Sequence, residues 1–216
     1  VAYGNMTTFE SCVNNGALTI DAAAGTNNDY LTVAGIIGRA NREGIKLTDC
    51  ENHGAITILS PSTSSGKTYN AKVVCAGGLI GYMSTTEEGY QKDILSNLTN
   101  YGQIKFLGKA SVTGYIGGVA AAMADTGTTD CKDLTNESTG TIVLKGVINS
   151  TSHTGEAPDL RVGGVVGHLA CDVNGASNYA NLTFTGKAST TYYGGGVVGY
   201  ATTAALTSFT NNATTT

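Results

Sequence analysis

Two groups of acidic side chains lie close enough in the sequence to do chemistry together. Asp125, Asp130 and Asp133 form one group, and Glu156 and Asp159 form the other. Clustered carboxylate oxygens are the ligands that Ca²⁺ prefers, and a pair of carboxylates can cleave a glycosidic bond. Acidic residues in loops are more often ordinary solvated charges. We therefore keep Asp125, Asp130 and Asp133 as candidate metal ligands but predict no metal site.

Other catalytic arrangements are missing from the sequence. His53, His153 and His168 form no His-Glu-x-x-His pair and have no cysteine at metal-ligand spacing. No Gly-x-Ser-x-Gly nucleophile motif is present. The glycine-rich stretch 114–118 lacks the Gly-Lys-Ser or Gly-Lys-Thr ending of a phosphate loop. We predict no catalytic residues, no cofactor and no enzyme activity.

Tyrosines are candidates for ligand contact without catalysis. The chain has 11 tyrosines against 4 phenylalanines and no tryptophan. A tyrosine ring can stack on a sugar, but tyrosines also pack at the rim of a core with the hydroxyl in water. We take Tyr82, Tyr101, Tyr179 and Tyr200 as candidate ligand-binding residues. The net charge of −4 and the scattered basic residues predict no nucleic-acid partner.

A short phrase that ends in asparagine occurs six times. It consists of an apolar residue, two spacers, a second apolar residue, one spacer and the asparagine. The six asparagines are Asn14, Asn52, Asn100, Asn136, Asn178 and Asn211. Most copies lead into a strand with alternating apolar residues, such as Ile56 and Ile58. A second phrase, with a glycine, two small or β-branched residues and then glycine or alanine, begins at Gly35, Gly78, Gly118, Gly164 and Gly196.

The two phrases predict an all-β fold, a parallel β-helix or β-solenoid of about five coils with variable loop insertions. Residues 1–216 would form a single repeat domain. A short unit with one apolar face cannot bury that face alone, so successive units must stack and share a core. An outer ladder of Thr19, Thr57, Lys105, Val143 and Thr183 and an amide ladder of the six asparagines at a corner should result.

The glycines of the second phrase are expected where a side chain would hold two layers apart. At the corners, His53 follows Asn52 and should be exposed. His168 stands where Tyr82 and Tyr200 stand in other units, and we expect it to be exposed too. Little helix is expected, and a leucine-rich-repeat horseshoe and a β-propeller are the alternative repeat folds.

The cysteines leave two interpretations open. There are 5, so at least one has no partner within the chain. Buried free thiols acting as small hydrophobic residues are the favoured interpretation. Cys12 and Cys50 occupy the same repeat position, however, and neighbouring coils would bring them within disulfide range.

The glycine phrases 77–82, 163–168 and 195–200, each followed by an Asn-x-small-x-apolar phrase, resemble the GLUG repeats of bacterial surface proteins. The resemblance implies a solenoid module of a large secreted or surface-anchored protein, with a structural or adhesive role and a glycan or a host surface protein as partner. It is also typical of the non-catalytic regions of immunoglobulin A1 protease-like proteins. The alternative is a β-helix enzyme of the polysaccharide lyase or hydrolase type.

The start of the given sequence shows no pattern that predicts a targeting signal. The chain begins at Val1 without a basic and apolar leader, and it has no run of about 18 apolar residues that would predict a membrane span. A solenoid that stopped at Thr216 would expose a strand edge. We therefore expect a piece of a longer protein with adjoining domains, located outside the bacterial cell.

Overall fold

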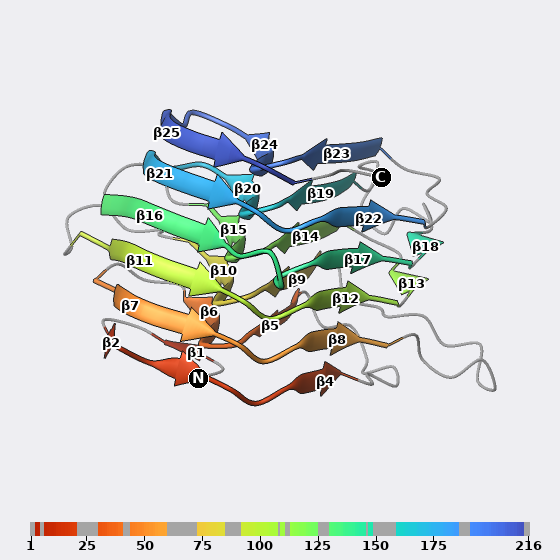
Figure 1. Cartoon of the computed structure of the whole chain (residues 1–216), viewed down its shortest axis with the longest axis horizontal. Coiled ribbons are helices and arrows are strands. Elements are labelled where there is room, and N and C mark those ends of the chain that lie inside the picture. Colours follow the sequence, from red (N-terminus) through yellow and green to blue (C-terminus); the bar gives the residue numbers. More distant parts are fainter. Residues whose placement is uncertain are drawn as a thin grey trace.

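The computed structural model describes residues 3–4, 7–20, 30–40, 44–59, 73–84, 92–107, 109–110, 113–124, 130–145, 147–148, 159–185 and 191–213. Within these residues the chain is all-β and contains no helix. It winds into a parallel β-helix of about five coils, so the predicted fold is confirmed (Figure 1). In Figure 1 the N-terminus lies at the bottom of the stack and the C-terminus near its top.

Each coil contributes one strand to each of four sheets, and neighbouring strands in these sheets are parallel. Sheet A consists of β1 (Tyr3–Gly4), β6 (Ile37–Ala40), β10 (Ile80–Met83), β15 (Ala120–Met123), β20 (Val166–Leu169) and β24 (Val198–Ala201). Sheet B consists of β2 (Thr8–Glu10), β3 (Val13–Asn14), β7 (Lys46–Asn52), β11 (Ile94–Asn100), β16 (Asp130–Asn136), β21 (Val173–Asn178) and β25 (Leu206–Asn211).

The other two sheets complete the coil. Sheet C consists of β4 (Leu18–Ile20), β8 (Ile56–Ile58), β12 (Ile104–Phe106), β17 (Ile142–Leu144) and β22 (Leu182–Phe184). Sheet D consists of β5 (Tyr30–Ala34), β9 (Val73–Gly77), β14 (Thr113–Gly117), β19 (Asp159–Gly163) and β23 (Thr191–Gly195). A short pair, β13 (Lys109–Ala110) and β18 (Val147–Ile148), lies outside these sheets.

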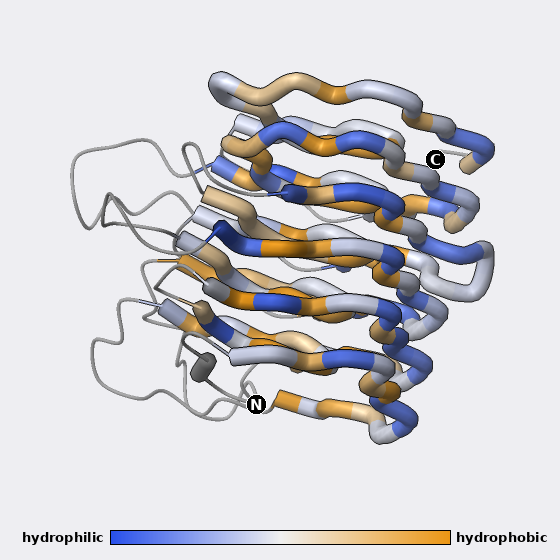
Figure 2. The backbone as a smooth tube through the Cα atoms, turned by 90° about the vertical axis from the view of Figure 1, so that its left-hand side faces the viewer, coloured by the Kyte–Doolittle hydropathy of each residue, from blue (hydrophilic) through white to orange (hydrophobic). Residues whose placement is uncertain are grey.

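Equivalent residues of successive coils lie directly beside one another. Ile104 pairs in register with Ile56 and with Ile142, and all three are fully buried. Lys105, one residue further on, pairs with Thr57 and Val143 on the outer side. The predicted outer ladder is therefore present, since Thr19 and Thr183 continue it at the two ends. Figure 2 shows hydrophilic positions recurring at the same place in successive coils.

Two separate cores fill the coil. One lies between sheets A and B and contains Leu47, Leu95 and Met83. The other lies between sheets C and D and contains Ile56 and Val162. Because burying apolar area is the main favourable contribution to folding, each coil depends on its neighbours to cover both cores.

A backbone bulge explains the odd spacing of the asparagine phrase. The second spacer residue has a positive φ in successive coils: 53° at Ser11, 53° at Asp49, 52° at Asn97, 56° at Asp133 and 55° at Ser208. Gly175 takes this place in β21 with a φ of 91°. One left-handed residue turns the strand so that apolar residues three apart, rather than two, both point into the core. Aspartate, asparagine and glycine accept this conformation most readily.

Candidate functional site

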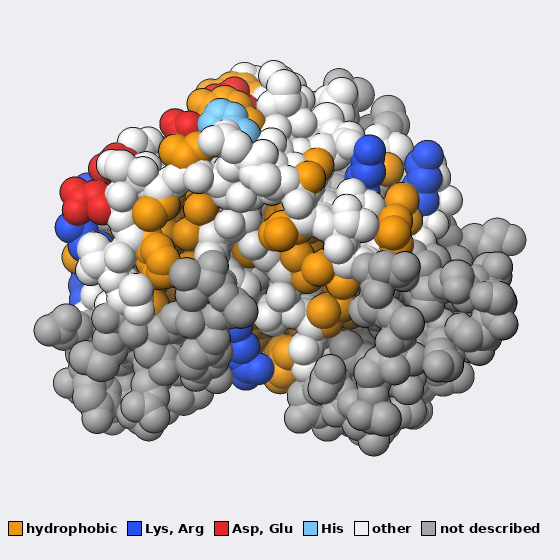
Figure 3. Space-filling view, turned by 90° about the horizontal axis from the view of Figure 1, so that it is seen from below, with side chains coloured by type: hydrophobic (Ala, Val, Ile, Leu, Met, Phe, Trp, Pro, Cys, Tyr) orange, Lys and Arg blue, Asp and Glu red, His pale blue; other side chains and the backbone are white. Residues whose placement is uncertain are grey.

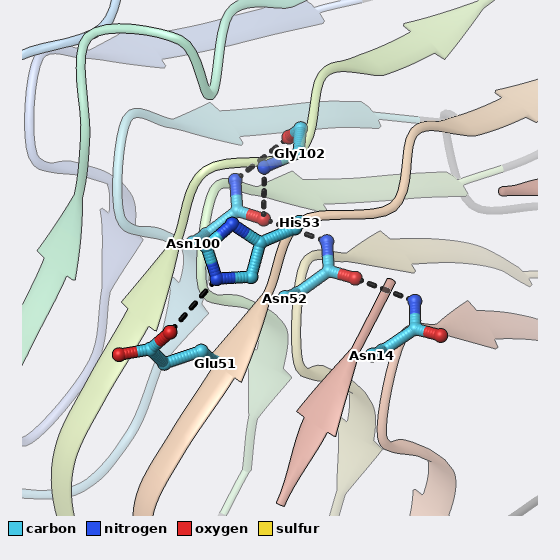
Figure 4. Close-up of polar contacts among 6 residues, drawn as sticks. All are labelled: Asn14, Glu51, Asn52, His53, Asn100 and Gly102. Carbon is cyan, nitrogen blue, oxygen red and sulfur yellow. Dashed lines mark hydrogen bonds and ion pairs between the residues drawn. The ribbon is translucent and has the colours of Figure 1, made fainter. Parts of the chain in front are cut away.

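The six asparagines of the repeated phrase form one continuous ladder of side-chain amides. The Nδ2 of each donates to the Oδ1 of the next, at 2.7 Å from Asn14 to Asn52 and 2.8 Å from Asn52 to Asn100 (Figure 4). The ladder continues to Asn136, Asn178 and Asn211 over 2.8, 3.0 and 3.1 Å. Four of the six, Asn52 to Asn178, are completely buried.

Each amide also bonds to the corner of its own coil. Asn100 donates from Nδ2 to the Gly102 carbonyl at 2.9 Å and accepts from the Gly102 amide at 3.2 Å. Asn136 reaches the carbonyl of Gly140 instead, because its corner is two residues longer. These bonds occupy the hydrogen-bonding groups of the ladder, which a buried amide requires. The ladder therefore holds coils together and has no groups left for a ligand between Asn52 and Asn178.

The first glycine of the second phrase lies against this ladder from the opposite side of the coil. A Cβ atom on Gly78 would lie 2.4 Å from the Asn100 Oδ1 and 2.1 Å from the Gly118 carbonyl oxygen of the next coil. Gly118, against Asn136, and Gly164, against Asn178, are equally crowded. Glycine is thus needed between layers, as predicted. It is also needed across the coil, where the missing side chain lets the turn between sheets D and A approach the amide ladder.

The four tyrosines predicted to bind a ligand lie on two different parts of the surface. Tyr82 and Tyr200 occupy equivalent positions of sheet A, in the register Arg39, Tyr82, Ala122, His168, Tyr200. Tyr101 and Tyr179 instead occupy the corner between sheets B and C, one residue after Asn100 and Asn178. The structure therefore does not bring the four residues together into one site.

Tyr82 and Tyr200 belong to a larger group, which we call the tyrosine–arginine face. It is formed where the outer sides of sheets A and D meet. Its members are Tyr30, Arg39, Tyr82, Tyr115, Arg161, His168, Tyr193 and Tyr200. The two sheets approach closely because Gly81, Gly167 and Gly199 leave room, since a Cβ on Gly199 would lie 2.6 Å from the Val162 nitrogen.

Each arginine of the tyrosine–arginine face packs on two tyrosine rings. The Arg161 Cζ lies 4.0 Å from the centre of the Tyr200 ring and 5.2 Å from that of Tyr115. The Arg39 Cζ lies 4.4 Å from the Tyr30 ring and 5.6 Å from the Tyr82 ring. Such cation–π contacts fix the guanidinium groups. Arg161 also donates from Nε and an Nη atom to the Asp159 carboxylate, at 2.9 and 2.6 Å.

Aromatic contacts extend this face toward the C-terminal coil. The ring centres of Tyr193 and Tyr200 are 5.0 Å apart, and Tyr193 is 36% exposed. Figure 3 shows the opposite end of the stack, from below, where hydrophobic side chains are exposed across the middle of the view. Burial raises the pKa of Tyr115 even though the positive charge of Arg161 lowers it, so the Tyr115 hydroxyl stays protonated. The face thus offers aromatic rings with fixed cations and hydroxyl donors.

His168 is less exposed than its corner position predicted. Its ring lies 5.2 Å from Tyr115 and 5.6 Å from Tyr200, and neither ring nitrogen is exposed or has a hydrogen-bond partner among the described residues. Burial, together with the positive charge of Arg161, lowers the pKa of His168 from 6.5 to about 4. The expectation of an exposed His168 is therefore wrong, because sheet D covers this position.

We expect the stability of the wild type to fall as the pH drops from 6.5 to 4. An unfolded histidine gains a proton in this range, whereas folded His168 resists protonation until about pH 4. The stabilisation is complete above pH 6.5, and about 1–3 kcal/mol should be lost after allowance for partial exposure. Urea unfolding at several pH values, compared with a His168→Phe variant, measures this contribution. Identical pH dependence in the two proteins would contradict it.

The corner between sheets B and C carries a smaller aromatic group. His53 is exposed, as predicted, and its ring stacks on Tyr101 with centres 4.5 Å apart and planes 8° from parallel. Its Nε2 lies 2.8 Å from the Glu51 carboxylate (Figure 4). Tyr179, further along, is 38% exposed. Glu137 stands between Tyr101 and Tyr179 in the register and interrupts the row of rings.

The acidic groups are not assembled into a cation site within the described residues. Asp130 lies 3.8 Å from the Lys92 Nζ, and Asp133 occupies the bulge of β16. Asp125 and Glu156 lie outside the described residues, whereas Asp159 pairs with Arg161. No group of three metal-binding side chains occurs in the part of the chain that the structure describes. His153 also lies outside it.

Five members of the tyrosine–arginine face are not among the ligand-binding residues selected from the sequence: Tyr30, Arg39, Tyr115, Arg161 and Tyr193. One signal was available, because Tyr82, His168 and Tyr200 share the position just after a glycine phrase. The contribution of sheet D was hidden, since its strands precede the glycine phrases and belong to a different part of each repeat unit.

Comparisons with family models, with curated proteins and with solved structures found no match to the chain. Among the described residues there is also no helix of the length and hydrophobicity that a membrane crossing requires.

Proposed function

We propose that this chain is a non-catalytic β-solenoid module of the GLUG-repeat type, in a secreted or surface protein of bacteria, and that it binds glycans. The observation that carries the proposal is the tyrosine–arginine face. It combines five tyrosine rings and two fixed guanidinium groups on one side of the stack. The adhesive role follows from this face, and the stack of coils serves as a rigid support for it.

The chemistry of this face suits sugars. A pyranose ring has an apolar C–H face, which packs on aromatic rings, and hydroxyl groups, which accept hydrogen bonds from arginine and tyrosine donors. Tyr193 is the most accessible of the rings at 36% exposed, and it contacts Tyr200, which also packs against Arg161 and His168. We therefore assign first contact with the ligand to Tyr193, Tyr200 and Arg161.

The tyrosine–arginine face runs along the stack of coils, which favours an extended glycan over a compact ligand. Its members come from successive coils, and neighbouring coils are about 4.8 Å apart. Tyr82 lies on β10 and Tyr200 on β24, three strands further along sheet A. Three spacings of this size place Tyr82 and Tyr200 about 14 Å apart along the stack. A polysaccharide that runs parallel to the stack would therefore meet them with sugar units that are not adjacent, which predicts that affinity increases with oligosaccharide length.

Glycan-array screening of the intact chain, followed by calorimetry with the best oligosaccharide, tests the proposal. We expect Tyr193→Ala and Tyr200→Ala each to weaken binding by about tenfold or more, as is usual for an aromatic anchor. Tyr179→Ala is the matched control, because Tyr179 is equally exposed at 38% but lies on the B/C corner. It should bind like the wild type.

Three results would contradict this assignment. The chain could bind no glycan, or Tyr179→Ala could weaken binding as much as Tyr193→Ala does. The third is reproducible depolymerisation of a polysaccharide that Asp130→Ala abolishes, which would make the chain an enzyme. Depolymerisation should therefore be measured on the same samples.

A further inference from the structure

Two cysteines occupy equivalent positions on neighbouring coils. Cys12 lies between β2 and β3, and Cys50 lies in β7, with which both β2 and β3 pair. Val13 and Glu51, the next residues, are partners in register, and the Glu51 amide donates to the Cys12 carbonyl at 2.9 Å. Cys12 and Cys50 therefore stand directly beside each other across the two coils.

The side chains of this pair point to the same place. The Cys50 Sγ lies 3.2 Å from the Thr48 carbonyl and 3.7 Å from the Phe9 carbonyl of the neighbouring coil. The Cys12 Sγ lies 3.6 Å from the Glu10 carbonyl, and Glu10 is the register partner of Thr48, so the two thiols have equivalent orientations. Both also contact the core between sheets A and B. The two sulfur atoms thus share one small region at the edge of that core.

The other cysteines are not matched in this way. Cys131 pairs in register with Leu95 and Val173, and Cys75 pairs with Thr32 and Tyr115. Cys171 lies two residues before the strand position that faces Cys131. Among the described residues, Cys12 and Cys50 are therefore the cysteines that stacking places opposite one another.

We propose that Cys12 and Cys50 form a disulfide that covalently joins the first two coils. Neighbouring parallel strands are about 4.8 Å apart, which falls within the Cα separation of about 4.4–6.8 Å that a disulfide accepts. The bond would close a loop around one whole coil. All five cysteines are thiols in the structure, which is the reduced form of the pair.

Formation of this bond requires a two-electron oxidant. A small disulfide such as oxidised glutathione can act as that oxidant. The Cys12 thiolate attacks one sulfur of glutathione disulfide, forms a mixed disulfide and releases one glutathione thiolate. The Cys50 thiol then loses its proton and attacks the Cys12 sulfur, which releases the second glutathione. Two protein thiols are oxidised and one small disulfide is reduced.

Accessibility sets the order of these two steps. Cys12 is partly exposed, whereas Cys50 is fully buried. Burial raises the pKa of the Cys50 thiol, although a hydrogen bond from the Cys12 backbone acts in the opposite direction. Cys12 is therefore the residue that meets the oxidant, and Cys50 is the residue that resolves the mixed disulfide.

The test is oxidation of the native 216-residue chain with oxidised glutathione, followed by thiol titration and peptide mapping. We expect the loss of two titratable thiols and one cross-linked peptide that contains Cys12 and Cys50. Cys12→Ala should keep its remaining thiols, whereas Cys171→Ala, the control, should still form the cross-link. Hydrogen exchange of residues 8–14 should slow by about tenfold or more in the oxidised protein.

Each alternative outcome overturns the proposal. The wild type could retain all five thiols after oxidation, or the cross-link could join other cysteines. Cys12→Ala could also lose two thiols under native conditions. The thiol titration and the peptide mapping do not depend on glycan binding. A failure of the disulfide proposal therefore leaves the proposed function untouched, and the reverse is also true.

Discussion

Replacing Ile104 with aspartate is expected to unfold at least the coil that contains it. The Ile104 side chain is fully buried in the core between sheets C and D, with Ile56 and Ile142 on either side. An aspartate there would bury a carboxylate among apolar side chains without a cation. A buried unpaired charge costs several kcal/mol, and we expect a loss of about 4 kcal/mol or more in the free energy of unfolding.

Thr57→Asp is the control for this substitution. Thr57 lies next to Ile56 in β8 and faces outward, where it pairs in register with Lys105 and Thr19. An exposed aspartate beside a lysine changes stability by about 0.5 kcal/mol or less. Urea unfolding followed by circular dichroism measures both variants. Equal tolerance of Ile104→Asp and Thr57→Asp would contradict the inward and outward assignment of sheet C.

The coiled architecture could be predicted because its signals are local and repeated. The alternation in Ile56, Thr57 and Ile58 marks a strand with one apolar face, and a fixed asparagine before such strands marks a corner. Stacking places equivalent residues of successive coils beside one another. The ladder of Asn52, Asn100 and Asn136 therefore follows from the repeat alone.

The bulge in sheet B was not predictable from the same pattern. Apolar residues three apart, such as Leu95 and Leu98, are also typical of a helix, so the spacing does not reveal a strand. Only the left-handed conformation of Asn97, with a φ of 52°, lets both leucines reach one core. The sequence supports this conformation at Asn97 and Asp133, whereas Ser11 and Ser208 carry no such signal.

The tyrosine–arginine face was hidden for a different reason. Arg161 and Tyr200 are far apart in the sequence and belong to different sheets, yet the Arg161 Cζ lies 4.0 Å from the Tyr200 ring. Their contact depends on how sharply the chain bends between sheets D and A. The angle between the two sheets is set by the close approach of Gly199 to the backbone of β19. The spacing of the repeats in the sequence does not predict this angle.

Gly118→Ala is expected to have the second large effect on stability. A Cβ at this position would lie 2.1 Å from the Gly164 carbonyl oxygen and 2.3 Å from the Asn136 Cγ. The backbone of the next coil and the amide ladder must both shift to make room, which weakens hydrogen bonds on either side of Asn136. Overpacking of this kind costs about 2–4 kcal/mol. Urea unfolding provides the measurement.

Gly16→Ala is the matched control for the steric argument. The nearest atom to a Cβ on Gly16 is the Asn14 Oδ1 at 3.6 Å, which is an ordinary contact, and Gly16 is exposed. Its substitution should change stability by about 1 kcal/mol or less. If Gly16→Ala and Gly118→Ala cost the same, crowding between coils is not the reason for the glycine phrase.

A comparison of two glycines separates the two sources of crowding. The three nearest atoms to a Cβ on Gly196 all belong to the Asn211 side chain, at 2.2–2.7 Å, whereas Gly118 also meets the backbone of the next coil. Asn211→Ala should therefore relieve the cost of Gly196→Ala, with a coupling of about 1 kcal/mol or more in a double-mutant cycle. Asn136→Ala should not rescue Gly118→Ala, because the Gly164 carbonyl remains in place. Equal rescue at both sites would show that the amide ladder alone, rather than the spacing of the coils, requires these glycines.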